Sequence, residues 1–297
     1  MSLNDRTHTG GYALETGAAA ARRLHVLHDI YAPAGRRVLL QAGLRKGMRV
    51  ADFGCGVGAV TRMLAKMVGP KGTVTGIDVS EAQLQQASEV CAGEGLTNTS
   101  FHKADATCTG LPRNWFDLVY CRFLLLHLPD PASCLREMRE VLRPGGILVV
   151  EDGDLASART VPPTAMDAFS ELFCKFGPTC GLDYSLAKNL YPLVKSAGFS
   201  DAQIEVHQPA ILSRENRSFL KWSVEEAGPA FVAAGIVTAE QLERTLAGMQ
   251  EAVEDSTVLI LAPRMSLVWA RKALGVPSTG GGSTSRRSLT PRLELTI

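Results

Sequence analysis

The 297-residue sequence lacks the features that would place it in or across a membrane. No apolar run approaches the roughly 20 residues that a membrane-spanning helix needs. The longest candidate, LVYCRFLLLHL, is interrupted by Arg122 and His127. Residues 1–11 are polar and show no apolar segment behind a basic start, so we expect no secretory signal peptide. These absences predict a cytoplasmic protein with no membrane partner.

An excess of charge of one sign is also absent. Lys plus Arg number 31 and Asp plus Glu number 30, and no basic stripe or RNA-binding motif appears. Because nucleic-acid binding depends on clustered positive charge, we expect no nucleic-acid partner. Cysteine is sparse: seven residues, an odd number, with no CxxC pair. This pattern predicts free thiols in a reducing compartment and no metal site.

What the sequence does contain, from residue 48 onward, is an alternation of short apolar strands and amphipathic helices. The predicted strands are MRVADF, TVTGID, TSFHK, FDLVYC and GILVVE. Strands that alternate with helices imply right-handed crossovers and a parallel sheet covered on both faces. The sequence therefore predicts an α/β, doubly wound, mostly parallel sheet whose ligand lies beyond the carboxyl ends of the strands.

The segments on either side of this core follow a looser pattern. Residues 13–43 carry helical spacing, with Pro33 expected to begin a second helix. After residue 154 we expect an aromatic helix, a helical insertion, and two late strands, AQIEVHQPAI and RMSLVWARK. The predicted parts are an N-terminal helical lid (1–44), a cofactor-binding core (45–154), a helical cap with two closing strands (155–273) and a disordered tail (274–297).

A glycine-rich turn after the first strand is the main candidate for a cofactor site. The stretch GCGVGA also satisfies the dinucleotide fingerprint, so glycine spacing alone does not identify the cofactor. Asp52, two residues before Gly54, would oppose a phosphate but suit a cation. Asp78 ends the second strand, where it could hold a ribose, and Asp105 follows the third, where it could accept from an adenine amine. S-Adenosylmethionine has a ribose, an adenine and two cationic groups but no phosphate, so this charge pattern favours it.

An ordered set of motifs between residues 48 and 152 supports the same cofactor. VADFGCGVG, VTGIDVS, KADA, LVYCRFLLLHLPDP and VLRPGGILVVED resemble, in this order, the class I S-adenosylmethionine-dependent methyltransferases. The resemblance is strongest to the group that includes the ubiquinone and menaquinone biosynthesis methyltransferases. It implies a Rossmann-like sheet of seven strands, the last antiparallel.

The resemblance also implies a role for particular residues. Asp52 would lie near the methionine ammonium, the glycines would let the backbone approach, and Cys121 would line the methionine end. Asp78 would hold the ribose hydroxyls, Val79 would lie against the adenine, and Asp105 would take its exocyclic amine. The stretch YALETGAAAARRL resembles the family's lid, although alanine-rich helix packing explains it equally well. The implied cofactor-binding residues are Tyr12, Asp52, Gly54, Gly56, Gly58, Asp78, Val79, Asp105, Ala106 and Cys121.

The acceptor of the methyl group is less constrained. His127 and Asp152 are the candidate catalytic bases. The alternatives are a structural role for His127 and helix capping or solvation for Asp152. The aromatic residues of the cap, such as Phe173 and Trp222, are either core or the wall of an apolar pocket. The favoured function is methyl transfer to a small, largely apolar metabolite, with homodimer formation left open. The alternatives are an aminopropyltransferase, which Asp52 argues against, a degenerate fold with a binding or regulatory role, and, least favoured, an NAD-linked oxidoreductase.

Overall fold

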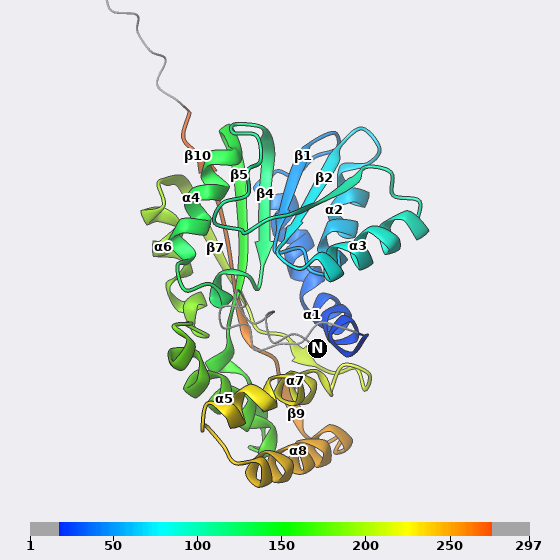
Figure 1. Ribbon diagram of the computed structural model, residues 1–297, viewed down its shortest axis with the longest axis vertical. Coiled ribbons are helices and arrows are strands. Elements are labelled where there is room, and N and C mark those ends of the chain that lie inside the picture. Colours follow the sequence, from blue (N-terminus) through cyan, green and yellow to red (C-terminus); the bar gives the residue numbers. More distant parts are fainter. Residues whose placement is uncertain (1–17, 275–297) are drawn as a thin grey trace, which may run out of the picture.

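The computed structural model describes residues 18–274, with side chains from residue 22 onward, and its centre is a seven-stranded sheet (Figure 1). The strand order is β3-β2-β1-β4-β5-β10-β7. Neighbouring strands are parallel except around β10, which is antiparallel to both β5 and β7. The predicted sheet and its antiparallel last strand are confirmed. The strands are β1 (Arg49–Phe53), β2 (Thr73–Asp78), β3 (Thr99–Lys103), β4 (Phe116–Arg122), β5 (Leu142–Asp154), β7 (Phe199–His207) and β10 (Arg264–Lys272).

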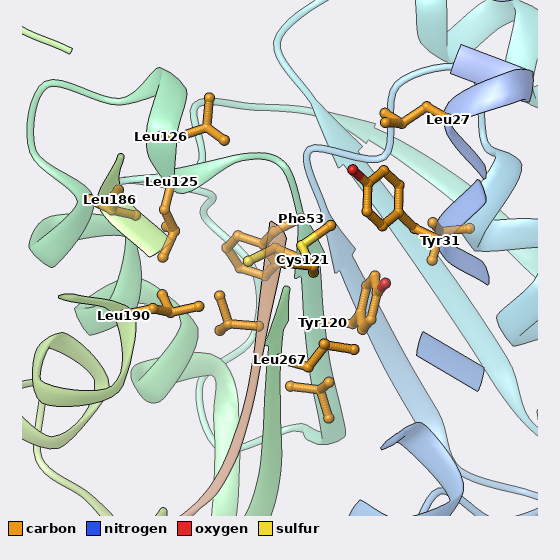
Figure 2. Packing of buried hydrophobic residues seen from close by; sticks show 14 of the residues in the cluster. Leu27, Tyr31, Phe53, Tyr120, Cys121, Leu125, Leu126, Leu186, Leu190 and Leu267 are labelled. Carbon is orange, nitrogen blue, oxygen red and sulfur yellow. The ribbon is translucent and has the colours of Figure 1, made fainter. Parts of the chain in front are cut away.

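Helices cover both faces of the sheet, as the apolar central strands require. Helices α1 (Ala18–Ala42), α2 (Ala59–Val68) and α3 (Glu81–Gly93) precede or connect β1, β2 and β3. Helix α4 (Pro131–Val141) packs on β5, and α6 (Leu190–Ser196) packs on β7 and β10. Figure 2 shows the two sides of the core: Tyr120 of β4 faces Tyr31 of α1, while Cys121 points the other way with Phe53. Adjacent residues of one strand therefore belong to different layers.

Helix α1 differs from the expectation at Pro33. It runs unbroken from Ala18 to Ala42 with Pro33 inside it, so the predicted restart of a second helix is wrong. A proline removes one helical hydrogen bond, but the helix buries an apolar stripe, including Tyr31 and Val38, against the sheet. Packing therefore outweighs the lost bond. No helix in the described part of the chain is long and apolar enough to cross a bilayer.

The cap lies beyond the carboxyl end of β5, at one end of the sheet (Figure 1). It consists of α5 (Ala168–Phe176), α7 (Phe219–Ala233), α8 (Ala239–Glu254) and a small sheet that the sequence did not predict. This small sheet has the order β6 (Arg159–Val161), β9 (Leu259–Leu261), β8 (Ala210–Ile211). Of the predicted tail, residues 275–297 lie outside the described residues.

Candidate functional site

The glycine turn at residues 54–58 joins β1 to α2 at the carboxyl edge of the sheet. Gly54, Gly56 and Gly58 have φ angles of 67°, 52° and 76°, a region that side chains disfavour. A Cβ on Gly54 would lie 2.8 Å from Leu124 Cδ1, and one on Gly58 would lie 2.8 Å from Ala87 Cβ. The turn is therefore held between the end of β4 and α3, and it presents backbone rather than side chains.

Asp78, at the end of β2, is bonded to this turn. Its Oδ2 accepts a hydrogen bond from Gly56 N at 2.9 Å, and its Oδ1 accepts one from Ser80 N at 2.9 Å. A carboxylate has about four acceptor positions, so two remain. The next residue, Val79, is 67 % exposed although apolar. A pair of neighbouring hydroxyls on Asp78 with a flat ring against Val79 would satisfy both.

Asp105 follows β3 and continues the same edge. Thr107 donates its backbone N–H (2.7 Å) and its hydroxyl (2.6 Å) to Asp105 Oδ1. These bonds hold the pKa of the Asp105 carboxyl below its usual range. The segment is tied to the previous strand because Ala104 N donates to Asp78 O at 3.1 Å. Asp105 is exposed and Ala106 half-buried, so a charged acceptor stands beside a small apolar surface.

Asp52 lies behind the glycine turn rather than at its open side. It is 2 % exposed, and Thr61 donates its hydroxyl to Asp52 Oδ2 at 2.6 Å. Burial raises the pKa of Asp52 to about 7, although Thr61 and Arg122 favour its charged form. The Asp52 carboxylate is therefore enclosed by the chain, and Thr61 is its hydrogen-bond partner.

Two predicted cofactor residues are not seen at the site. The Cys121 side chain is fully buried in the apolar core, where its strand position pairs with Phe53 and Val150 (Figure 2). It lies elsewhere than predicted, because strand alternation turns it to the face away from Asp52 and Tyr120. Tyr12 lies outside the described residues.

Asp152 accepts hydrogen bonds from the start of a short helix. Its Oδ2 accepts from Leu125 N (2.9 Å) and Leu126 N (3.3 Å), and its Oδ1 accepts from Gly153 N (3.0 Å). Burial raises the pKa of Asp152 to about 7, while these three N–H groups favour the charged form. Asp152 is fully buried, so it holds the short helix Leu125–His127 against β5 and has no surface for a substrate. These contacts favour the alternative of helix capping.

His127 ends that short helix and packs edge-on against Tyr184, with ring centroids 5.6 Å apart. Burial lowers the pKa of His127 to about 3, and the positive charge of Arg23 acts in the same direction. The imidazole is therefore neutral at pH 7, and its conjugate acid is too strong for His127 to hold a substrate proton well. This environment favours the structural role.

Helix α1, which includes part of the predicted lid, contacts helix α7 of the cap. Arg23 of α1 forms a buried ion pair with Glu226 of α7 (Nε–Oε2, 2.9 Å). The adjacent residue, Arg22, has its guanidinium 4.3 Å from the centre of the Trp222 ring, one turn before Glu226 on α7. These contacts close the cap against α1. Within the described residues no group of three or more His, Cys, Asp or Glu side chains is arranged to hold a metal ion.

Comparison with known proteins decides the family. The family described as a methyltransferase domain matches residues 44–198, slightly more than half of the chain. The chain belongs to this methyltransferase family. The matched residues contain the glycine turn, Asp78 and Asp105. The resemblance to class I S-adenosylmethionine-dependent methyltransferases, expected from the motifs, is confirmed.

Individual relatives agree with this assignment. The chain is similar to demethylmenaquinone methyltransferase of Staphylococcus aureus, with 33% identity over 165 residues, covering 56% of this chain and 66% of that protein. It thus spans just under two thirds of this curated relative. A putative methyltransferase from Bacillus halodurans has the same fold (TM-score 0.54, 18% identity, 80% of this chain and 98% of the other). So does Haemonchus contortus phosphoethanolamine N-methyltransferase 2 in complex with S-adenosylmethionine (TM-score 0.51, 19% identity, 85% and 52%).

Proposed function

We propose that the protein is an S-adenosylmethionine-dependent methyltransferase that acts on a small, largely apolar metabolite in the cytoplasm. The observation that carries the proposal is the row of groups at the edge formed by β1, β2 and β3. Asp78 can accept from the ribose hydroxyls, Val79 can lie against the adenine, and Asp105 can accept from its amine. All seven cysteines are free, in keeping with a reducing compartment.

The glycine turn fits this cofactor better than a dinucleotide. A dinucleotide places its pyrophosphate on the free N–H groups of such a turn. Here Gly56 N–H already donates to the Asp78 carboxylate, and a second carboxylate, Asp52, stands behind the turn. Both arrangements disfavour a bound phosphate and favour a cationic ligand.

When bound, S-adenosylmethionine supplies a methyl group on a positively charged sulfur. The chain's own contribution is to orient the two ligands and to exclude water. The cap contributes to this exclusion, since α7 is bonded to α1 through Arg23 and Glu226. His127 and Asp152 are both poorly suited to accept a proton. We therefore infer an acceptor whose nucleophilic atom ionises readily or has no proton to lose before transfer.

A thermal-shift measurement tests the proposed cofactor. S-Adenosylhomocysteine, the product that remains after methyl transfer, is expected to raise Tm by about 5 °C at about 100 times its Kd, because it binds only the folded chain. NAD at the same concentration is expected to leave Tm unchanged. A shift with NAD, or none with S-adenosylhomocysteine at millimolar concentration, would contradict the proposal. A screen of metabolites with labelled cofactor would then identify the acceptor.

A further inference from the structure

One face of the sheet, under α1, carries a group of charged and polar side chains, of which the proposed function uses only Asp52. Asp52 of β1 lies opposite Tyr120 of β4 in the strand register, and Arg122 of β4 lies opposite Glu151 of β5. Alternate residues of a strand share a face, so these four side chains project to the same side. Helix α1 covers them closely: a Cβ on Gly35 would lie 2.6 Å from Glu151 Oε1. The group lies at the carboxyl edge, directly beside the glycine turn.

Glu151 is the unusual member of this group. It is 0 % exposed, and the Tyr120 hydroxyl is the one described side chain that stabilises its charged form by hydrogen bonding. One Arg122 nitrogen, Nη1, is buried without a hydrogen bond to the described residues. Burial raises the pKa of Glu151 to about 7, against the opposing effects of Arg122 and Tyr120. A fully buried carboxylate is costly to the fold, so packing alone does not explain it.

The surrounding charges leave this region with an excess of negative charge. Arg122 is the one fixed positive charge in the group, and its Nη2 lies 3.1 Å from His28 Nδ1 on α1. Burial and the neighbouring Arg122 lower the pKa of His28 to about 4, so His28 is neutral near pH 7. Above pH 7 the two carboxylates, Asp52 and Glu151, therefore outnumber the single guanidinium. A negative electric field of this kind attracts a cationic ligand. The interaction extends over several ångströms because the effective dielectric constant of the interior is low.

We propose that the buried carboxylate of Glu151 makes the chain bind S-adenosylmethionine more tightly than S-adenosylhomocysteine. This inference rests on the proposed function, because it takes the glycine turn as the cofactor site. The two ligands share the adenine, ribose, ammonium and carboxylate groups, which Asp78, Val79 and Asp105 cannot distinguish. They differ in the methyl group and in the positive charge that it gives the sulfur. Glu151 acts on that charge, so it strengthens binding before transfer and favours release of the product afterwards.

Titration calorimetry at pH 8, where Glu151 is ionised, tests this proposal. Each ligand is titrated into the wild-type chain, Glu151→Gln, Glu151→Met and a control, Glu205→Gln. Glu205 lies on β7 and pairs with Arg37, so the control removes a carboxylate at the edge of the sheet away from the glycine turn. In both Glu151 variants the Kd for S-adenosylmethionine is expected to rise about tenfold, while that for S-adenosylhomocysteine stays within about twofold. The control is expected to match the wild type for both ligands.

The two substitutions distinguish the effect of losing the negative charge from the effect of losing the folded state. Gln keeps the shape of Glu but leaves a buried amide, whereas Met fills a similar volume without a hydrogen-bonding group, and melting curves show which variant is folded. An equal loss of affinity for both ligands, or no loss for S-adenosylmethionine, overturns the role of Glu151. A wild-type chain that binds neither ligand overturns the proposed function instead, so the two failures are distinguishable.

Discussion

Asp78→Ala is expected to weaken S-adenosylhomocysteine binding by about 100-fold, or about 3 kcal/mol. In the proposed cofactor site, the substitution removes the acceptor of two charged hydrogen bonds to ribose hydroxyls. It also frees Gly56 N–H and Ser80 N–H, which Asp78 holds at 2.9 Å each. Titration calorimetry measures the loss, and the melting temperature without ligand shows whether the fold survives.

Asp105→Asn provides the comparison for this variant. Asp105 is exposed and its bonds to Thr107 are local, so the change removes one charge and leaves the chain path intact. We expect its effect on affinity to be about fivefold, as for a single exposed hydrogen bond. Equal effects at the two positions, or unchanged affinity in a folded Asp78→Ala, would contradict the ribose role.

The cofactor edge was predictable because its signals are local. A strand, a glycine turn and a helix follow one another within about twenty residues, and each acid stands at or just after a strand end. Parallel strands bring their carboxyl ends to one edge, so positions far apart in sequence could be placed together. Asp78 and Asp105 lie where this reasoning put them, and both are open enough to bind a ligand.

The surroundings of the catalytic candidates could not be predicted, because they depend on contacts between distant segments. Asp152 looks like any acid after a strand, yet Leu125 and Leu126, more than twenty residues earlier, take its carboxylate as their cap. Cys121 differs from Arg122 by one strand position, which moves its side chain to the opposite face. Glu151 gave one sequence signal, an acid at the end of the predicted strand GILVVE, whereas its register with Arg122 is known only from the structure.

The contacts within the cap were equally hard to predict from the sequence. Arg217 stands in an ordinary polar stretch, SRENRS, with no pattern to single it out. In the structure its guanidinium donates to four backbone carbonyls at and after the end of α8, those of Ala252, Val253, Asp255 and Val258. Helical spacing likewise could not separate core from pocket among the aromatic residues of the cap.

Phe173→Ala is expected to lower the free energy of unfolding by about 3–5 kcal/mol, the cost of a large buried cavity. Phe173 of α5 is 1 % exposed. Its ring centroid lies 4.9 Å from that of Phe169, 5.3 Å from Tyr184 and 5.1 Å from Phe231 of α7. The ring therefore joins α5 to α7 within the core of the cap, and we expect its loss to act mainly on stability. Urea unfolding without ligand measures the loss.

Trp222→Ala separates this packing role from a role in acceptor binding. Trp222 is half-buried on α7 and carries Arg22 of the lid on its ring, so its removal is expected to cost about 1–2 kcal/mol of stability. It loosens the contact between cap and lid, and we expect it to raise the acceptor KM more than it changes Kd for the cofactor. A stable Phe173→Ala with a raised acceptor KM would reverse the assignment of Phe173, because a ring that contacts the acceptor can be removed without leaving a cavity in the core.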